Sequence, residues 1–164
     1  MNVITLKITW LNQFRQFWMN LAFLGVMLYF FFSSDGMPMT LLLILGAFVG
    51  FVVLFPLHVH IDYLTRNYGE TYEIDDTKII RRKNGLETVY NVTDITDIYL
   101  YRSSVNRIPW GMYHFAQIVM KSGENIYLTS LLYPSVWGIQ KILENYLKVP
   151  FLREEVWLTT TPHD

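Results

Sequence analysis

The stretch "FVVLFPLHVHIDYLTRNYGETYEI", residues 51–74, contains the transition on which the fold depends. Its first part ends a long run without charged residues, and its middle carries the possible metal ligands His58, His60 and Asp62. After Tyr68 the pattern changes to short β-rich segments separated by turn residues, which indicates strands rather than a further apolar helix. A membrane-type sequence therefore ends here and a β-type sequence begins.

The composition favours insertion into a membrane. The chain has 164 residues, of which 52% are apolar and 16% aromatic, and its mean hydropathy is +0.23, too apolar for a soluble domain of this size. A net charge of −1 gives no general reason to bind nucleic acid. Because there is no cysteine, disulfides, thiolate metal sites and Cys nucleophiles are excluded.

Two uncharged runs, residues 17–32 and 37–57, are the candidate membrane spans. At 1.5 Å per residue they measure about 24 and 31 Å, against a hydrocarbon core of about 30 Å, so the first needs its flanks to cross. The short connection "SSDGMP" makes residues 14–66 an antiparallel hairpin with both chain ends on one side. It carries no Lys or Arg, whereas basic residues flank the hairpin, so both termini are predicted to be cytoplasmic.

Two features of the second span suggest specific roles. Gly46 and Gly50 form a GxxxG motif, which is predicted to pack helices either within the hairpin or between partners. His58 and His60 point to different faces of a continuous helix, so a zinc site with Asp62 would require the helix to end there. We interpret these three residues as the interfacial end of the span, with a pH-sensitive contact and a metal-dependent membrane enzyme as alternatives.

The remainder predicts an antiparallel meander closed by a helix. Turn residues at 75–76, 84–85 and 122–123 separate the strands. The expected strands are 70–75, 78–83, 86–91, 95–102, 112–121 and 124–130. A helix is expected from Pro134 to just before Pro150, with one apolar stripe that needs a surface to cover.

The N-terminal residues 1–13 also have a strand pattern. In "VITLKITWL", apolar residues from Ile4 to Trp10 alternate with Thr and Lys, which favours a strand that could join the same sheet. The hairpin would then be an insertion into a split β domain. The remaining units are a domain at 67–149 and an apolar tail at 150–164, which is expected to dock on this protein or on another.

Three segments carry a resemblance to a known family: "TYEIDDTKIIRRKNG", "VYNVTDITDIYLYRS" and "IVMKSGENIYLTSLLYPSVWGIQKIL". Over roughly residues 15–148 the chain resembles bacterial PH-like (pleckstrin-homology-like) membrane proteins with a two-helix hairpin. The resemblance implies a membrane hairpin plus an α+β cytoplasmic domain, in which a strongly bent antiparallel sheet or barrel is capped by a C-terminal helix. It also implies the bacterial inner membrane and a role in binding rather than catalysis.

The candidate sites follow from this resemblance and from the residue types. Lys78, Arg81, Arg82 and Lys83 look similar to the phosphate-binding hairpin of eukaryotic PH domains, so they are the candidate lipid-binding residues. The candidate partner-binding residues are Gly46, Gly50, Arg107, Trp110 and Trp157. No catalytic motif or cofactor site is recognisable. The expected function is a membrane-anchored scaffold that self-associates or joins other membrane proteins, with anionic-lipid binding as the alternative.

Overall fold

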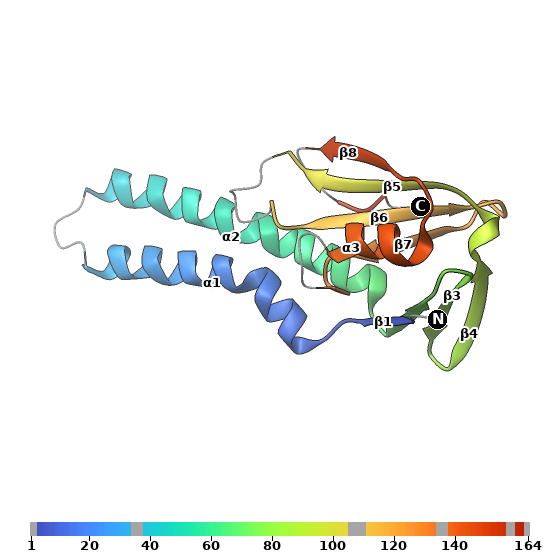
Figure 1. Ribbon diagram of the computed structural model, residues 1–164. Helices are drawn as coiled ribbons and strands as arrows, with labels where there is room; N and C mark the ends of the chain where they lie inside the picture. The colour runs from blue at the N-terminus through green and yellow to red at the C-terminus, as the bar shows by residue number, and fades with distance from the viewer. Residues whose placement is uncertain (1–2, 34–37, 105–110, 134–137, 157–159, 163–164) are drawn as a thin grey trace.

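Two long antiparallel helices lead into a domain of two sheets and a short helix, as Figure 1 shows. The computed structural model describes residues 3–33, 38–104, 111–133, 138–156 and 160–162. The helices are α1 (Trp10–Ser33) and α2 (Met39–Asn67). A strand, β1 (Ile4–Lys7), precedes α1 and pairs antiparallel with β2 (Glu70–Ile74), which follows α2. The two helices are therefore inserted between neighbouring strands of one sheet.

The first sheet has the order β1-β2-β3-β4, with β3 at Lys78–Lys83 and β4 at Leu86–Asn91. Its turns have local causes. The Asp75 carboxylate accepts the backbone N–H of Thr77 at 2.7 Å and that of Lys78 at 2.9 Å, which closes the β2–β3 turn. The β3–β4 turn places Asn84 at φ 51° and Gly85 at φ 80°, a conformation that Asn and Gly tolerate.

The second sheet has the order β7-β6-β5-β8. Its strands are β5 (Ile95–Ser103), β6 (His114–Met120), β7 (Asn125–Thr129) and β8 (Leu152–Val156). The expectation of one continuous meander was wrong, because the 3-10 turn Val92–Asp94 carries the chain from β4 into a different sheet. The sheets form no closed barrel in the described part of the chain. β8, which lies in the predicted tail, pairs parallel to β5.

The C-terminal helix covers the core between the two sheets. In the described residues it consists of α3 (Gly138–Ile142) and a π-helical turn (Leu143–Leu147), so the expected regular α-helix is replaced by a wider turn in its second half. Lys148 then takes φ 54° and ends the helix before Pro150. The buried Ile139, Ile142 and Leu143 pack into the core formed by the inner faces of both sheets.

Gly138 supports a prediction about this helix. A Cβ added at Gly138 would overlap the ring of Tyr133. We expect Gly138→Ala to lower the free energy of unfolding by about 1–3 kcal/mol, as overpacking does. Chemical denaturation in detergent micelles measures it, with Gly25→Ala as the control because a Cβ there meets no atom within 4 Å. Simple additivity of Gly138→Ala with Tyr133→Ala would contradict this cause.

The end of α2 belongs to the β domain rather than to the free hairpin. Val59 and Tyr63 are fully buried in a second cluster with side chains from β6, β7 and the adjoining segments. That cluster also contains Tyr113, Phe115, Tyr127 and Leu131. By contrast, only 11% of the most apolar window of each long helix is buried, and both helices are long and apolar enough to cross a membrane. One continuous helix thus joins an exposed apolar surface to a packed domain (Figure 1).

Candidate functional site

A polar cavity of about 610 Å³ opens between the end of α2, the inner face of β2 and β3, and β7 with the turn before it. We call it the polar cavity. Its lining includes Asp62, Arg66, Asn67, Glu70, Tyr72, Arg81, Lys83, Glu124, Asn125 and Tyr127. The volume lies in the range of small-molecule sites, but such sites are mostly apolar, whereas this lining is charged and hydrogen-bonded. The polar groups therefore decide what the cavity can do.

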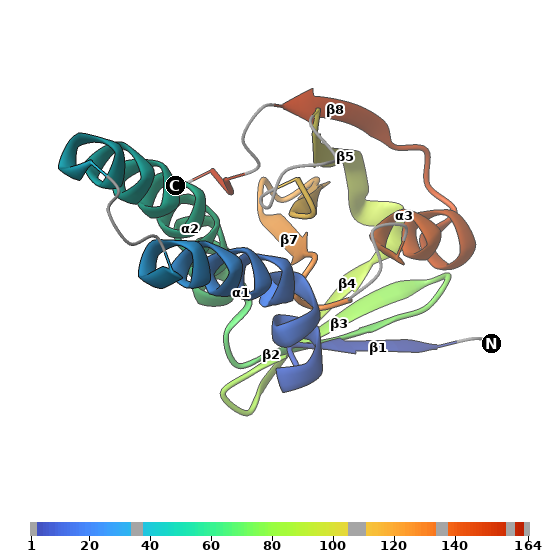
Figure 2. The same ribbon diagram turned by 90° about the vertical axis from the view of Figure 1, so that its left-hand side faces the viewer.

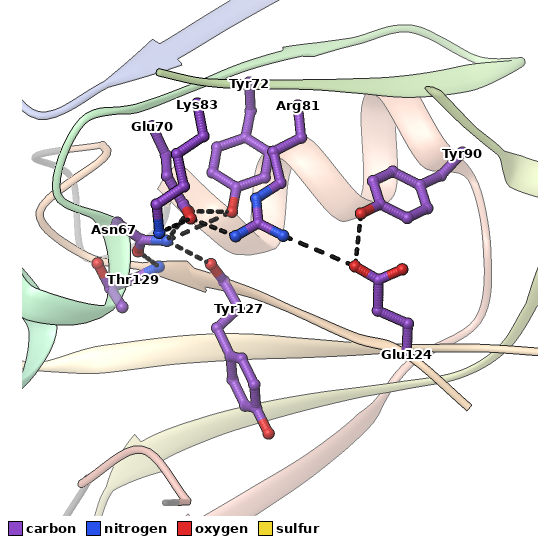
Figure 3. Close-up of polar contacts among 9 residues, drawn as sticks. All are labelled: Asn67, Glu70, Tyr72, Arg81, Lys83, Tyr90, Glu124, Tyr127 and Thr129. Carbon is purple, nitrogen blue, oxygen red and sulfur yellow. Dashed lines mark hydrogen bonds and ion pairs between the residues drawn. The ribbon is translucent and has the colours of Figure 1, made fainter. Parts of the chain in front are cut away.

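Glu70 is the centre of a network of polar contacts in the lining of the polar cavity (Figure 3). Its side chain is 1% exposed, and its Oε1 forms ion pairs with Arg81 and, at 3.0 Å, with Nζ of Lys83. Its Oε2 accepts the Tyr72 hydroxyl at 2.5 Å and the Asn67 amide at 3.1 Å. A buried carboxylate is stable when its oxygens are satisfied in this way. Glu70 therefore holds the inner face of β2 and β3 to the end of α2.

The ionisation of this cluster follows from its contacts. Burial raises the pKa of Glu70, but the hydrogen bonds from Tyr72, Arg81, Asn67 and Lys83 outweigh burial, so its pKa lies below the ordinary value. Burial, and then the Glu70 charge, raise the pKa of Tyr72, which stays a neutral donor. Since Glu70 remains ionised and Tyr72 protonated, neither is prepared for acid–base catalysis near neutral pH.

Asn67 ties α2 to the edge strand of the second sheet. Its Nδ2 donates to the Tyr127 carbonyl at 2.8 Å, and its Oδ1 accepts the Thr129 backbone N–H at 3.2 Å. These are the backbone groups on the side of β7 away from β6, so the amide takes the place of a further strand. The last residue of the helix is thereby coupled directly to the sheet.

The far end of the tail docks beside the polar cavity. Thr161 donates its backbone N–H to Asp62 at 2.8 Å and its hydroxyl to the same carboxylate at 3.0 Å. Arg66 hydrogen-bonds the Pro162 carbonyl and lies 4.3 Å from the centre of the Tyr127 ring. Since β8 also pairs with β5, the described parts of the tail dock on this chain, one of the two expected outcomes.

The four predicted lipid-binding residues do not form one basic surface. Alternation along β3 turns Arg81 and Lys83 toward the polar cavity, and places Lys78 and Arg82 on the opposite face. Arg81 and Lys83 share Glu70, while Arg82 pairs with Glu73 and, at 2.8 Å, with Glu87. Much of the positive charge is therefore matched within the domain.

The candidate metal ligands and the candidate partner-binding residues lie in different parts of the chain. His60 Nδ1 is 3.0 Å from the Tyr113 hydroxyl, and Asp62 binds Thr161, so these two side chains have protein partners. The described residues contain no group of three or more His, Asp or Glu that could hold a metal ion. Gly46 and Gly50 lie on α2 with no atom within 4 Å of an added Cβ. Arg107, Trp110 and Trp157 lie outside the described residues.

Sequence reasoning missed Glu70, Tyr72 and Asn67. A signal for two of them existed, because Glu70 and Tyr72 share a face with the buried Ile74, and the neighbouring strand presents Arg81 and Lys83 on that same face. A carboxylate on an inward face opposite two cations indicates a buried ion-pair cluster. Asn67 had no such signal, since its partner strand lies 60 residues further along the chain.

The comparison with protein families agrees with this architecture. A family model described as a PH domain matches residues 5–141, which run from β1 into α3 and include the two long helices. Among curated proteins, none matches the chain. PH domains are generally binding modules without catalytic activity, and they commonly bind lipids or proteins. Because this family model matches most of the chain, the protein belongs to the PH-domain family that it describes.

Proposed function

We propose that the protein is a non-catalytic interaction module, anchored in the bacterial inner membrane by α1 and α2 with both termini in the cytoplasm. The observation that carries the proposal is that a PH-like domain contains an apolar two-helix insertion whose outer surface no part of the described chain covers. Large exposed apolar surfaces mark membrane or protein contacts. The orientation rests on the basic residues that flank the hairpin.

Two other interpretations of the long apolar helices, a core helix of a soluble protein and a removable signal sequence, disagree with the contacts of the hairpin. The core helix of a soluble protein would be mostly buried, whereas the apolar windows of α1 and α2 are 11% buried. A removable signal sequence would take β1 away from β2 and break the bonds of Asn12 and Gln16 to the β domain. A permanent membrane hairpin agrees with both observations.

Self-association is the second part of the proposal. The residues of α2 that are at least half-buried include Leu42, Leu45, Val49, Gly50 and Val52, whereas Gly46 beside them is exposed. Because an added Cβ at Gly46 or Gly50 meets open space, the hairpin does not need these glycines for its own packing. Small residues on a free face allow a second helix to approach closely in lipid.

The test is the mass of the protein after gentle detergent extraction at native expression. We expect a dimer or larger species, and we expect Gly46→Leu with Gly50→Leu to convert it to monomer. Gly25→Leu is the matched control, since Gly25 lies on α1 and its added Cβ also meets nothing within 4 Å. A monomer in the unmodified protein, without any co-purifying protein, would contradict the proposed assembly.

Lipid binding by Lys78, Arg81, Arg82 and Lys83 stays a prediction, with two arguments against it. Their charges are largely matched by Glu70, Glu73 and Glu87. The second argument is distance. From Leu57, where the apolar run ends, to Asn67, α2 is about 15 Å long, and even at a 40° tilt this segment extends about 11 Å along the membrane normal. The headgroup layer is only about 5–7 Å thick, so the end of α2 lies beyond it. The β3–β4 turn lies beyond that helix end (Figure 1), where Asn84 is 3.8 Å from a Cβ added at Gly69.

A further inference from the structure

The first turns of α1 have one polar and one aromatic face. Asn12, Gln16 and Asn20 recur every four residues and are all buried. On the opposite face Trp10, Phe14, Trp18 and Leu21 follow one another at steps of four, four and three residues and are exposed, with Trp10 at 77%. We call this second face, together with Leu11, the aromatic stripe. Such separation is typical of a helix that lies between a protein and a second apolar phase.

The polar face attaches this helix to the β domain. The Asn12 amide donates to the carbonyls of Leu131 at 3.2 Å and Leu132 at 3.3 Å, both just after β7. The Gln16 amide donates to the Met112 carbonyl at 2.7 Å, just before β6. The first two turns of α1 are therefore part of the domain, although Trp10, Leu11 and Phe14 on their outer side are exposed.

The depth of these turns follows from the hairpin. The rings of Phe17 and His60 are 5.3 Å apart, so the start of α1 lies beside the polar end of the second span. Figure 1 shows that α1 bends away from α2 over these first turns instead of continuing alongside it, and Figure 2 shows the same bend from the side. A helix with one polar and one apolar face that runs obliquely beside the end of a span is suited to the boundary between headgroups and acyl chains.

We propose that the aromatic stripe is the surface by which the β domain itself rests on the bilayer, with Trp10, Leu11, Phe14 and Trp18 in the boundary between headgroups and acyl chains. The occupant is lipid rather than protein, because the stripe is continuous through Leu21 with the exposed apolar surface of the span. Trp favours this boundary, and the exposed Arg15 can reach the headgroups. The inference rests on the proposed membrane function.

One consequence concerns orientation. Since Asn12 and Gln16 fasten the interfacial turns to the segments that flank β6 and β7, the domain cannot rotate freely about α2. The end of the domain where β6 begins then faces the bilayer, and the β3–β4 hairpin lies beyond the end of α2, away from the membrane hairpin (Figure 1). The membrane contact of this PH-like domain is then aromatic, and β3 with its ion-paired basic residues lies on the side of the water.

Single-cysteine spin labels test this placement, because the chain has no cysteine of its own. The protein is reconstituted in phosphatidylglycerol–phosphatidylcholine vesicles as Trp10→Cys, Trp18→Cys, Leu28→Cys or Tyr68→Cys, and collisions with oxygen and with a water-soluble nickel chelate are compared. Leu28 is the control within the span, and Tyr68, exposed at the end of α2, is the aqueous control. Leu11→Cys replaces Trp10→Cys if that variant does not fold.

We expect the label at position 10 to have an oxygen-to-nickel collision ratio between those at positions 28 and 68, with position 18 nearer to 28. A ratio at position 10 equal to that at 68, while 28 remains in lipid, overturns the inference and leaves the proposed function standing. A ratio at position 10 equal to that at 28 also overturns it, since the first turns then belong to the span. Aqueous ratios at 10, 18 and 28 together overturn the membrane function itself.

Discussion

Replacing Glu70 by Gln is expected to lower the free energy of unfolding by about 2–4 kcal/mol, one of the two largest effects that we predict. Removing one partner from a buried ion pair costs about 3–5 kcal/mol, because the remaining charge is left without compensation. Solvent screening reduces that cost here, since the side chains of Arg81 and Lys83 are 27% and 43% exposed. Gln keeps the size of the side chain and an acceptor for Tyr72.

The same variant should lose part of the acid sensitivity of the protein. The native pKa of Glu70 lies below its ordinary value of 4.5, because its hydrogen bonds outweigh the effect of burial. The resulting stability is present above about pH 4.5 and is lost as the pH falls through the native pKa. Below that pH, the free energy of unfolding should therefore fall more steeply in the unmodified protein than in Glu70→Gln.

Denaturation in detergent micelles between about pH 3.5 and 7 measures both effects. Glu124→Gln is the matched control. Its carboxylate also faces Arg81, at 3.6 Å, but its side chain is 46% exposed, so a loss of less than about 1 kcal/mol is expected. If Glu70→Gln is no less stable than Glu124→Gln, the buried cluster does not hold the sheet to α2 as described.

The local signals in the sequence predicted the bounds of single strands more reliably than the way in which the strands divide into sheets. The ranges expected for β3 and β4 agree with Lys78–Lys83 and Leu86–Asn91, because an Asn-Gly turn sets their boundary from adjacent residues. The expected N-terminal strand is also present and pairs with β2. The division into two sheets was not predicted, since each turn signal is compatible with either continued pairing or a change of sheet.

The site was less predictable than the fold, because its parts come from distant segments. The basic run at 78–83 was visible, but its charge balance depends on Glu70, which the register of β2 with β3 brings opposite Lys83. The apolar tail indicated that it would dock, but not on which surface. Its residue Thr161 in fact binds Asp62, 99 residues earlier. Residue type indicates that a group needs a partner, whereas only the tertiary fold decides which partner it has.

Asn67→Ala is the second substitution with a large expected effect, a loss of about 2–4 kcal/mol in the free energy of unfolding. The side chain donates to the Tyr127 carbonyl and to Glu70, and it accepts the Thr129 N–H. Its removal deprives buried backbone groups of these partners, and each unsatisfied group costs about 1–3 kcal/mol. Glu70 also loses one of the hydrogen bonds that keep its pKa below the ordinary value.

Hydrogen exchange locates the effect as well as measuring it. In Asn67→Ala the Thr129 amide should exchange faster, because it points away from β6 and depends on the Asn67 oxygen. The amides of Ile126 and Leu128 alternate with it and point toward β6, so their protection should fall only with global stability. Asn145→Ala, on the exposed side of the C-terminal helix, is the control. Unchanged exchange at Thr129 would mean that α2 is not coupled to the sheet through this amide. Its coupling to the domain would then rest on its other contacts, such as the apolar packing around Val59 and Tyr63.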